Sequence, residues 1–150
     1  MKPLLHILFL LLAFTAGARP HTYDVVIVGG TPAGITAAVA AAREGKNSVI
    51  LERSDHVGGL PVNGLGATDI ATRGAMAGLF AHFVVLNKAH YTEKYGADSQ
   101  QVRDCSDGYH FEPSVAAETF ARMLAEAGPG RITVLTGRQF DAEARYVEKR

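Results

Sequence analysis

Residues 23–60 read YDVVIVGGTPAGITAAVAAAREGKNSVILERSDHVGGL, and this stretch decides the fold. Residues 25–28 are a continuous apolar, mostly β-branched run, which is typical of a parallel strand buried on both faces. Residues 32–43 are mostly alanine, which predicts a helix that lies close to a sheet, and Gly45 stands where that helix would stop. A second apolar run at residues 48–51 completes a βαβ unit.

The turn between the first strand and the helix indicates a phosphate site. Dinucleotide-binding turns carry G-x-G-x-x-G, and this chain has Gly29, Thr31 and Gly34 at the three glycine places. Pro32 suits the first helical turn, where free N–H groups attract a pyrophosphate. Thr31 would either crowd the pyrophosphate or donate its hydroxyl to a phosphate oxygen, and a tight turn without any nucleotide is the plain alternative.

Two features after the second strand extend this site. Glu52 follows the strand about twenty residues after the glycine turn, where a carboxylate can accept hydrogen bonds from the hydroxyls of a ribose. Gly58 and Gly59 allow a backbone to pass close to a flat ligand, and a flexible glycine loop is the alternative explanation.

The segments DVVIVGGTPAG, LERSDHVGGLPVNGLGATD and FEPSVAAETFARMLAEAG resemble the amino-terminal part of FAD-dependent oxidoreductases with the glutathione-reductase-type FAD-binding fold. Within that family the resemblance is to the group whose turn reads GGTPAG, where the threonine is a family feature. The most specific part is the glutamate followed six residues later by paired glycines. The resemblance implies an α/β class, with a three-layer, Rossmann-like domain on a parallel sheet that is incomplete at its carboxyl end.

The resemblance also implies FAD as the cofactor and assigns residues to it. The glycine turn would hold the pyrophosphate, Glu52 the adenosine ribose, Arg53 and Phe140 the adenine side, and the paired glycines the phosphates and ribityl chain. The loop over residues 63–69 would approach the isoalloxazine ring. The predicted cofactor-binding residues are Gly29, Gly30, Thr31, Pro32, Ala33, Gly34, Glu52, Arg53, Gly58, Gly59, Leu60 and Phe140.

Residues 1–18 have the pattern of a secretory signal peptide. Lys2 gives a positive start, residues 4–14 an apolar core, and residues 16–18 a small-residue cleavage site. A retained membrane anchor is the lesser alternative, because the apolar run is short for a bilayer. We therefore expect a secreted or extracytoplasmic protein, without stable membrane association after cleavage, whose residues 19–150 form a truncated FAD-binding domain.

Composition excludes some functions. The chain has 15 basic and 15 acidic residues, which gives no basic surface for nucleic acid. Cys105 is the only cysteine, so an internal disulfide is impossible; we expect an unpaired thiol in a loop, without a covalent flavin link. No metal site is predicted.

The rest of the chain continues the α/β pattern. Apolar spacing predicts a long helix over residues 72–95, and a polar loop or lid over 96–108. A second helix is predicted from Pro113, then a third strand over 132–135 and a fourth over 140–147.

The predicted activity is oxidation of a small organic substrate, with FAD accepting a hydride or two electrons. His56, His110, Asp69 and Asp107 are acid/base candidates, and none of them is singled out as catalytic. The resemblance implies that substrate contacts come largely from a later part of the family's chain, so this fragment alone is expected to be inactive. Two alternatives stay open, an NAD(P)-binding dehydrogenase domain and a truncated, non-catalytic nucleotide-binding module.

Overall fold

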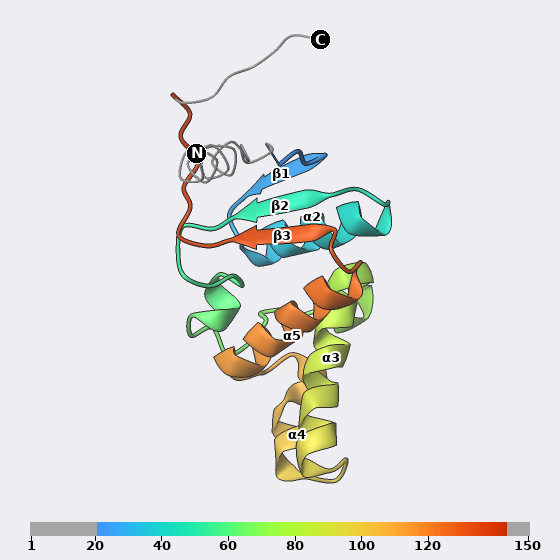
Figure 1. Ribbon diagram of the computed structural model, residues 1–150. Helices are drawn as coiled ribbons and strands as arrows, with labels where there is room; N and C mark the ends of the chain where they lie inside the picture. The colour runs from blue at the N-terminus through green and yellow to red at the C-terminus, as the bar shows by residue number, and fades with distance from the viewer. Residues whose placement is uncertain (1–20, 144–150) are drawn as a thin grey trace, which may run out of the picture.

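The computed structural model describes residues 21–143. The predicted signal peptide and the last residues of the predicted fourth strand lie outside the described residues. The sheet lies at one end of the molecule and α3, α4 and α5 extend away from it (Figure 1). In chain order the elements are β1 (Val25–Val28), α2 (Pro32–Arg43), β2 (Ser48–Leu51), η2 (Leu60–Val62), η3 (Arg73–Ala75), α3 (Gly78–Tyr95), α4 (Gln100–Asp104), η4 (Ser106–Gly108), α5 (Pro113–Glu126) and β3 (Ile132–Leu135).

The three strands form one parallel sheet in the order β1–β2–β3. Val25 pairs with Ser48 on one side of β2, and Ser48 pairs with Ile132 on the other. The strands have the bounds that the sequence predicted, and the α/β, Rossmann-like class is confirmed. The predicted fourth strand is wrong at its start, because residues 140–143 form no strand.

Helix α2 packs on one face of this sheet (Figure 1). Helix α2 contacts all three strands and also α5. On β1 the burial alternates, so that Ile27 packs against the core whereas Val26 and Val28 are 57% and 63% exposed. The expectation that β1 is buried on both faces is therefore wrong, because the described residues cover only one face of this strand. Of the three predicted layers, the described residues form two, the sheet and the helical layer on that face.

Helix α2 is set by its ends and by its small residues. Thr31 caps its first turn with Oγ1, which accepts from the Gly34 amide at 3.3 Å, and Pro32 occupies the first helical position. Ile35 and Ala38 are fully buried, because the alanines let the helix lie close to the sheet.

Helices α3 and α5 form the second half of the core. The Phe83 ring on α3 stacks on Phe120 of α5, with 4.7 Å between centroids, and meets the edge of Phe111 at 5.3 Å. Asn87 is fully buried between the same helices: its Nδ2 donates to the Gly108 carbonyl at 3.1 Å, and its Oδ1 accepts from the Thr119 hydroxyl at 2.7 Å. These bonds fix η4 and α5 to α3.

Two predicted elements differ from the structure. The helix expected from residue 72 begins at Gly78, because Gly78 has φ +63° and a left-handed residue cannot continue a helix from the preceding turn. The segment expected as a loop contains α4 and η4, and α4 begins where Ser99 Oγ accepts from the Val102 amide at 3.2 Å.

Cys105 lies in the turn between α4 and η4 with an unpaired thiol, as predicted, and the side chain is buried. Its thiol donates to the Val102 carbonyl at 3.2 Å. The side chain therefore acts as a small core residue with an internal partner.

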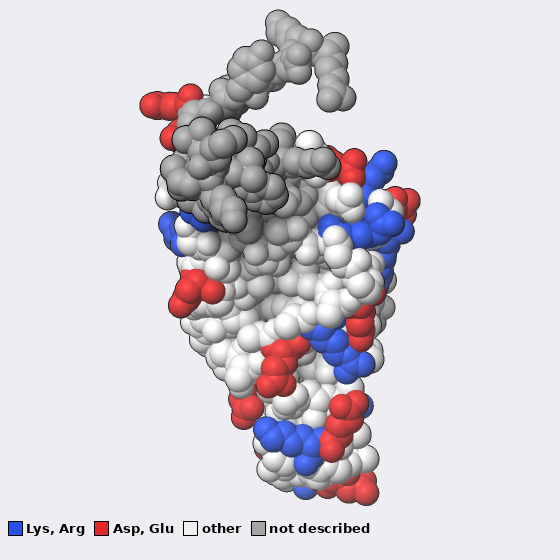
Figure 2. Space-filling model, viewed as in Figure 1, with Lys and Arg blue, Asp and Glu red and all other residues white. Residues whose placement is uncertain are grey.

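On the molecular face in Figure 2, acidic and basic side chains are interspersed rather than gathered by sign. None of the helices among residues 21–143 is long and apolar enough to cross a membrane. Over the same residues, no group of three metal-ligating side chains could hold a metal ion.

Candidate functional site

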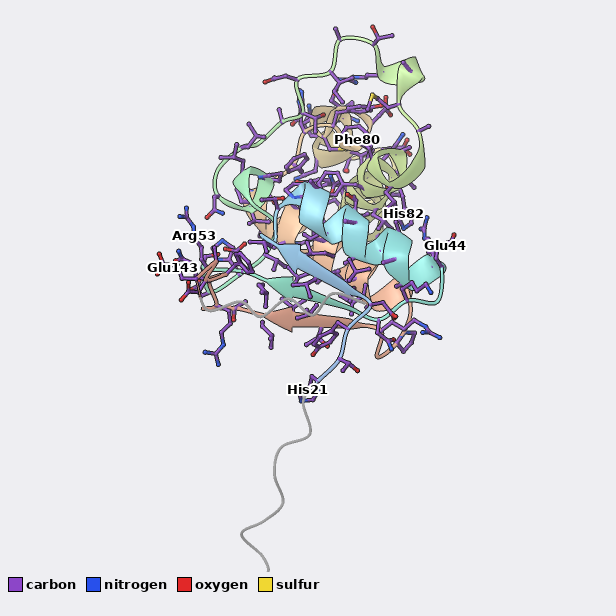
Figure 3. All side chains as sticks on the ribbon, turned by 90° about the horizontal axis from the view of Figure 1, so that it is seen from above. His21, Glu44, Arg53, Phe80, His82 and Glu143 are labelled. Carbon is purple, nitrogen blue, oxygen red and sulfur yellow. The ribbon has the colours of Figure 1, made fainter. Side chains whose placement is uncertain are left out.

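A groove of about 660 Å³ lies where the three strands end. Figure 3 shows Arg53 at this end of the domain and Glu44 at the opposite end of α2. The groove lies at the carboxyl edge of the parallel strands, where ligands bind in open α/β sheets. The predicted residues that line it are Gly29, Thr31, Glu52, Arg53, Gly59, Leu60 and Phe140.

The other predicted residues lie behind this lining. Gly30, Gly34 and Gly58 are buried, and Pro32 and Ala33 are in the first turn of α2. They shape the turns that carry the lining residues.

The first and last glycines of the turn are required by the backbone. Gly29 has φ +99°, a conformation that residues with a Cβ rarely adopt. A Cβ on Gly34 would overlap the carbonyl oxygen of Gly29, so this glycine sets how closely α2 approaches β1. Thr31 has φ −71° and ψ 169°, which any residue adopts, so its place in the turn needs no glycine.

Thr31 also leaves hydrogen-bond donors at the end of α2. Its Oγ1 accepts from Gly34, so the hydroxyl hydrogen remains available for a ligand. Pro32 has no N–H, and the Thr31 and Ala33 amides donate to no described residue. These donors lie at the positive end of the helix dipole, where an anion is stabilised.

Glu52 connects the end of β2 to the glycine turn. Its Oε2 accepts from the Gly30 amide at 2.7 Å, and its Oε1 accepts from the amide and the hydroxyl of Ser54, both at 2.8 Å. These bonds, with the Ser54 amide as the largest cause, hold the pKa of the Glu52 carboxyl below its usual range. The side chain is thus an ionised acceptor at neutral pH, fixed at the edge of the groove.

The paired glycines pack directly on the turn. The Gly58 amide donates to the Gly30 carbonyl at 2.6 Å. Gly59 has φ +59°, and a Cβ there would come within 3.1 Å of Pro32 Cδ. The loop after β2 and the amino end of α2 therefore form one continuous wall of backbone.

Several lining residues were not predicted from the sequence. The chain beyond β3 continues alongside Glu52, whose carbonyl accepts from the Arg138 amide at 2.9 Å, and so Arg138 and Gln139 enter the groove. Ser54 is recognisable from sequence as a hydroxyl two residues after the carboxylate, the spacing of a local side-chain to backbone turn. Asn63, the first residue of the loop that was predicted to approach the isoalloxazine ring, also lines this groove.

Of the four acid/base candidates only His56 lies in the groove. His110 lines a separate cavity beside Cys105. Asp107 forms an ion pair with Lys88 at 2.8 Å, and Asp69 is exposed. The structure does not bring the four together into one acid/base group.

The fold and the groove define a dinucleotide-binding α/β domain. Residues 24–148 match the family described as FAD dependent oxidoreductase. Because the match covers most of the chain, the protein belongs to this family, and its cofactor is FAD.

Individual relatives match over shorter stretches. A segment of 39 residues is 49% identical to the soluble pyridine nucleotide transhydrogenase of Chromohalobacter salexigens. This segment makes up 26% of this chain and matches 8% of that protein. A segment of 46 residues is 44% identical to the 4-oxocyclohexanecarboxylate 2-dehydrogenase of Sinomonas cyclohexanicum. This segment makes up 31% of this chain and matches 8% of that protein.

Two solved structures are similar over more of the chain. The THI4 protein of Thermovibrio ammonificans is 26% identical with a TM-score of 0.44, covering 89% of this chain and 46% of that one. The L-amino acid deaminase of Proteus vulgaris is 18% identical with a TM-score of 0.46, covering 80% of this chain and 41% of that one. The chain therefore spans less than half the length of these solved proteins.

Proposed function

We propose that the groove holds the ADP half of FAD in a secreted oxidoreductase. One observation carries the proposal: the free amides at the amino end of α2, the Glu52 carboxylate and the paired glycines all meet at one groove. A phosphate site and a ribose acceptor at this separation along a βαβ unit are what an adenine dinucleotide requires.

The residues that line the groove fit the ADP half of FAD. The Thr31 hydroxyl and the Thr31 and Ala33 amides would donate to the diphosphate. Among the described residues, Glu52 Oε2 accepts only from the Gly30 amide and keeps a lone pair for a ribose hydroxyl, whereas Oε1 already accepts two hydrogen bonds from Ser54. Phe140, 45% exposed in the groove, offers an apolar surface for adenine beside Arg53.

FAD would supply the redox chemistry by accepting a hydride or two electrons from a small organic substrate. The described residues bind and orient the cofactor. We assign no catalytic acid or base, because only His56 among the candidates reaches the groove. We infer that substrate contacts lie elsewhere in the family's fold, and that this chain by itself binds FAD without turnover.

Among the alternatives, the family match favours FAD over an NAD(P)-binding dehydrogenase domain. A non-catalytic nucleotide-binding module differs from the first proposal in its lack of redox turnover. Reduction of bound flavin by a substrate, in a protein that contains this chain, would separate these two.

Export is the remaining part of the proposal. The pattern of residues 1–18 supports cleavage after Ala18. Expression in a secretory host should yield a product whose first residue is Arg19, as determined by amino-terminal sequencing. An intracellular product that begins at Met1 would contradict export.

The cofactor test compares FAD with its two halves. Calorimetric titration of the full chain should show FAD binding that ADP competes away, whereas FMN, which lacks the AMP part of FAD, should compete poorly. The Glu52→Ala variant should bind FAD roughly tenfold more weakly or worse, because a charged hydrogen-bond acceptor is lost.

Glu44→Ala is the matched control, because Glu44 is an exposed glutamate at the far end of α2 (Figure 3). Circular dichroism should show that both variants are folded. A folded wild-type chain without affinity for FAD, or one for which FMN competes as well as ADP, would contradict the proposal. Binding of NADH in place of FAD would favour the dehydrogenase alternative.

A further inference from the structure

His56 lies in the wall of the groove between two oxygen atoms. Its Nδ1 is 2.6 Å from Asp55 Oδ1, and its Nε2 is 3.1 Å from Asn63 Oδ1. The Asn63 amide group is oriented by its other end, since Nδ2 donates to the Gly59 carbonyl at 2.8 Å. Reversing that amide would place two oxygens against each other, so an oxygen faces the histidine.

This arrangement selects one protonation state of the ring. Carboxylate and amide oxygens only accept hydrogen bonds, whereas a neutral imidazole has one N–H and one lone pair. A neutral His56 would therefore direct a lone pair at one of the two oxygens. Both contacts are satisfied together only when both ring nitrogens carry hydrogen. Hydrogen bonds to Asp55, the larger cause, and to Asn63 accordingly raise the pKa of His56.

The bonds of the imidazolium lead to the phosphate turn. The protonated ring of His56 donates to Asn63, and Asn63 donates to the Gly59 carbonyl. Gly59 in turn packs on Thr31 and Pro32. The ring thereby fixes the loop after β2 against the end of α2 where the diphosphate would lie.

The charges around this position favour an anion. Arg53 and Arg138 line the same groove, and Glu52 is its acidic lining residue. Asp55, 94% exposed in its side chain, partly offsets the charge of the ring from the solvent side. Loss of the proton from His56 would remove one of three cationic side chains from the lining.

We propose that His56 is a positioning residue for FAD: as an imidazolium it orders Asn63 and Gly59 beside the phosphate turn and adds positive charge for the diphosphate. This inference rests on the proposed function. The protonated form is present at low pH and is lost as the pH rises through the pKa of His56. FAD affinity should therefore fall as the pH rises, by about two- to fivefold, the effect expected of an exposed charge.

Two measurements test this role on the full chain. Nitrogen-15 NMR of the imidazoles, assigned with His56→Gln, should follow the protonation of both ring nitrogens of His56 as the pH is changed. Its titration midpoint should lie above the ordinary histidine value of about 6.5 and rise further when FAD is added. Calorimetry should give the dissociation constant of FAD at several values between about pH 6 and about pH 9, because histidines lose their charge within this range.

Three variants separate positioning from general stability. His56→Gln should weaken FAD binding at the lower pH and remove the decline as the pH rises. His56→Lys keeps the charge through this range and should bind with little pH dependence. The matched control is His82→Gln, because His82 is paired with Glu126 at 3.2 Å, away from the groove, and it should keep the wild-type profile (Figure 3).

The outcomes distinguish this inference from the proposed function. A His56 that titrates at or below the ordinary value, or a His56→Gln variant that binds FAD with the wild-type pH profile, would overturn the role of His56 while leaving FAD binding intact. A wild-type chain that binds no FAD at any pH would overturn both proposals.

Discussion

The packing of α2 on the glycine turn makes a strong prediction for Gly34→Ala. A Cβ at this position would overlap the Gly29 carbonyl oxygen and would lie 3.2 Å from Ile27 Cγ2. The overlapped atom belongs to the backbone and cannot rotate away, so helix and strand must separate. Overpacking of this kind costs about 1–3 kcal/mol, and the helix preference of alanine over glycine offsets at most about 1 kcal/mol.

The overlap with a backbone atom favours the upper end of this cost, so we expect the free energy of unfolding of Gly34→Ala to fall by about 2 kcal/mol. Urea denaturation followed by far-ultraviolet circular dichroism should show the midpoint lowered by roughly 1 M, given the usual dependence of stability on urea. FAD affinity should fall with it, because the Thr31 and Ala33 amides move with the helix end.

Gly74→Ala is the control, because a Cβ on Gly74 would meet no atom within 4 Å and its backbone is not left-handed. Its midpoint should stay at the wild-type value. If Gly34→Ala unfolds at the same urea concentration as Gly74→Ala, the close approach of α2 to β1 does not depend on Gly34.

Three further predictions concern other parts of the molecule. Asn87→Ala leaves two buried partners without their hydrogen bonds and should destabilise the fold by about 3 kcal/mol in thermal denaturation; an unchanged melting temperature would show that the buried bonds contribute little. Because the pKa of Glu52 is lowered in the folded state, its stabilising effect is present above the unfolded value of about 4.3 and is lost as the pH falls through the folded value. Between about pH 5 and about pH 3, wild type should thus lose more stability than Glu52→Gln, and equal losses would contradict this. The buried thiol of Cys105 should react slowly with a thiol reagent in the native protein and rapidly in denaturant, and rapid native labelling would show that the α4 region opens.

The sheet and α2 could be predicted from the sequence because local signals determine them. Strand β1 coincides with a continuous apolar run and the other two strands with mostly apolar runs, and α2 coincides with an alanine-rich segment between Thr31 and Gly45. The start of α3 could not be predicted, because apolar spacing continues through Gly78 while the backbone there is left-handed. The short helix α4 was missed because its polar residues lack a helical apolar stripe.

The candidate site was predictable where it depends on backbone turns and less so where it depends on contacts between distant segments. Gly29 and Gly34 were recognisable because the required turn has a sequence fingerprint. Arg138 enters the groove only because the chain after β3 pairs with Glu52, and sequence spacing does not reveal that pairing. His56 was recognised only as an acid/base candidate, whereas its two hydrogen-bond acceptors indicate a positioning role.

The register of the sheet has a consequence for the order in which the chain assembles. Ser48 finds Val25 soon after β2 is synthesised, but its other partner, Ile132, follows only after α3, α4 and α5. Closing the longer loop costs about 1 kcal/mol more in chain entropy, so we expect β3 to join after the helices have packed. Until then the hydrogen-bonding groups along one side of β2 have no neighbouring strand, and a newly made chain is most vulnerable to pairing with another copy of itself at that edge.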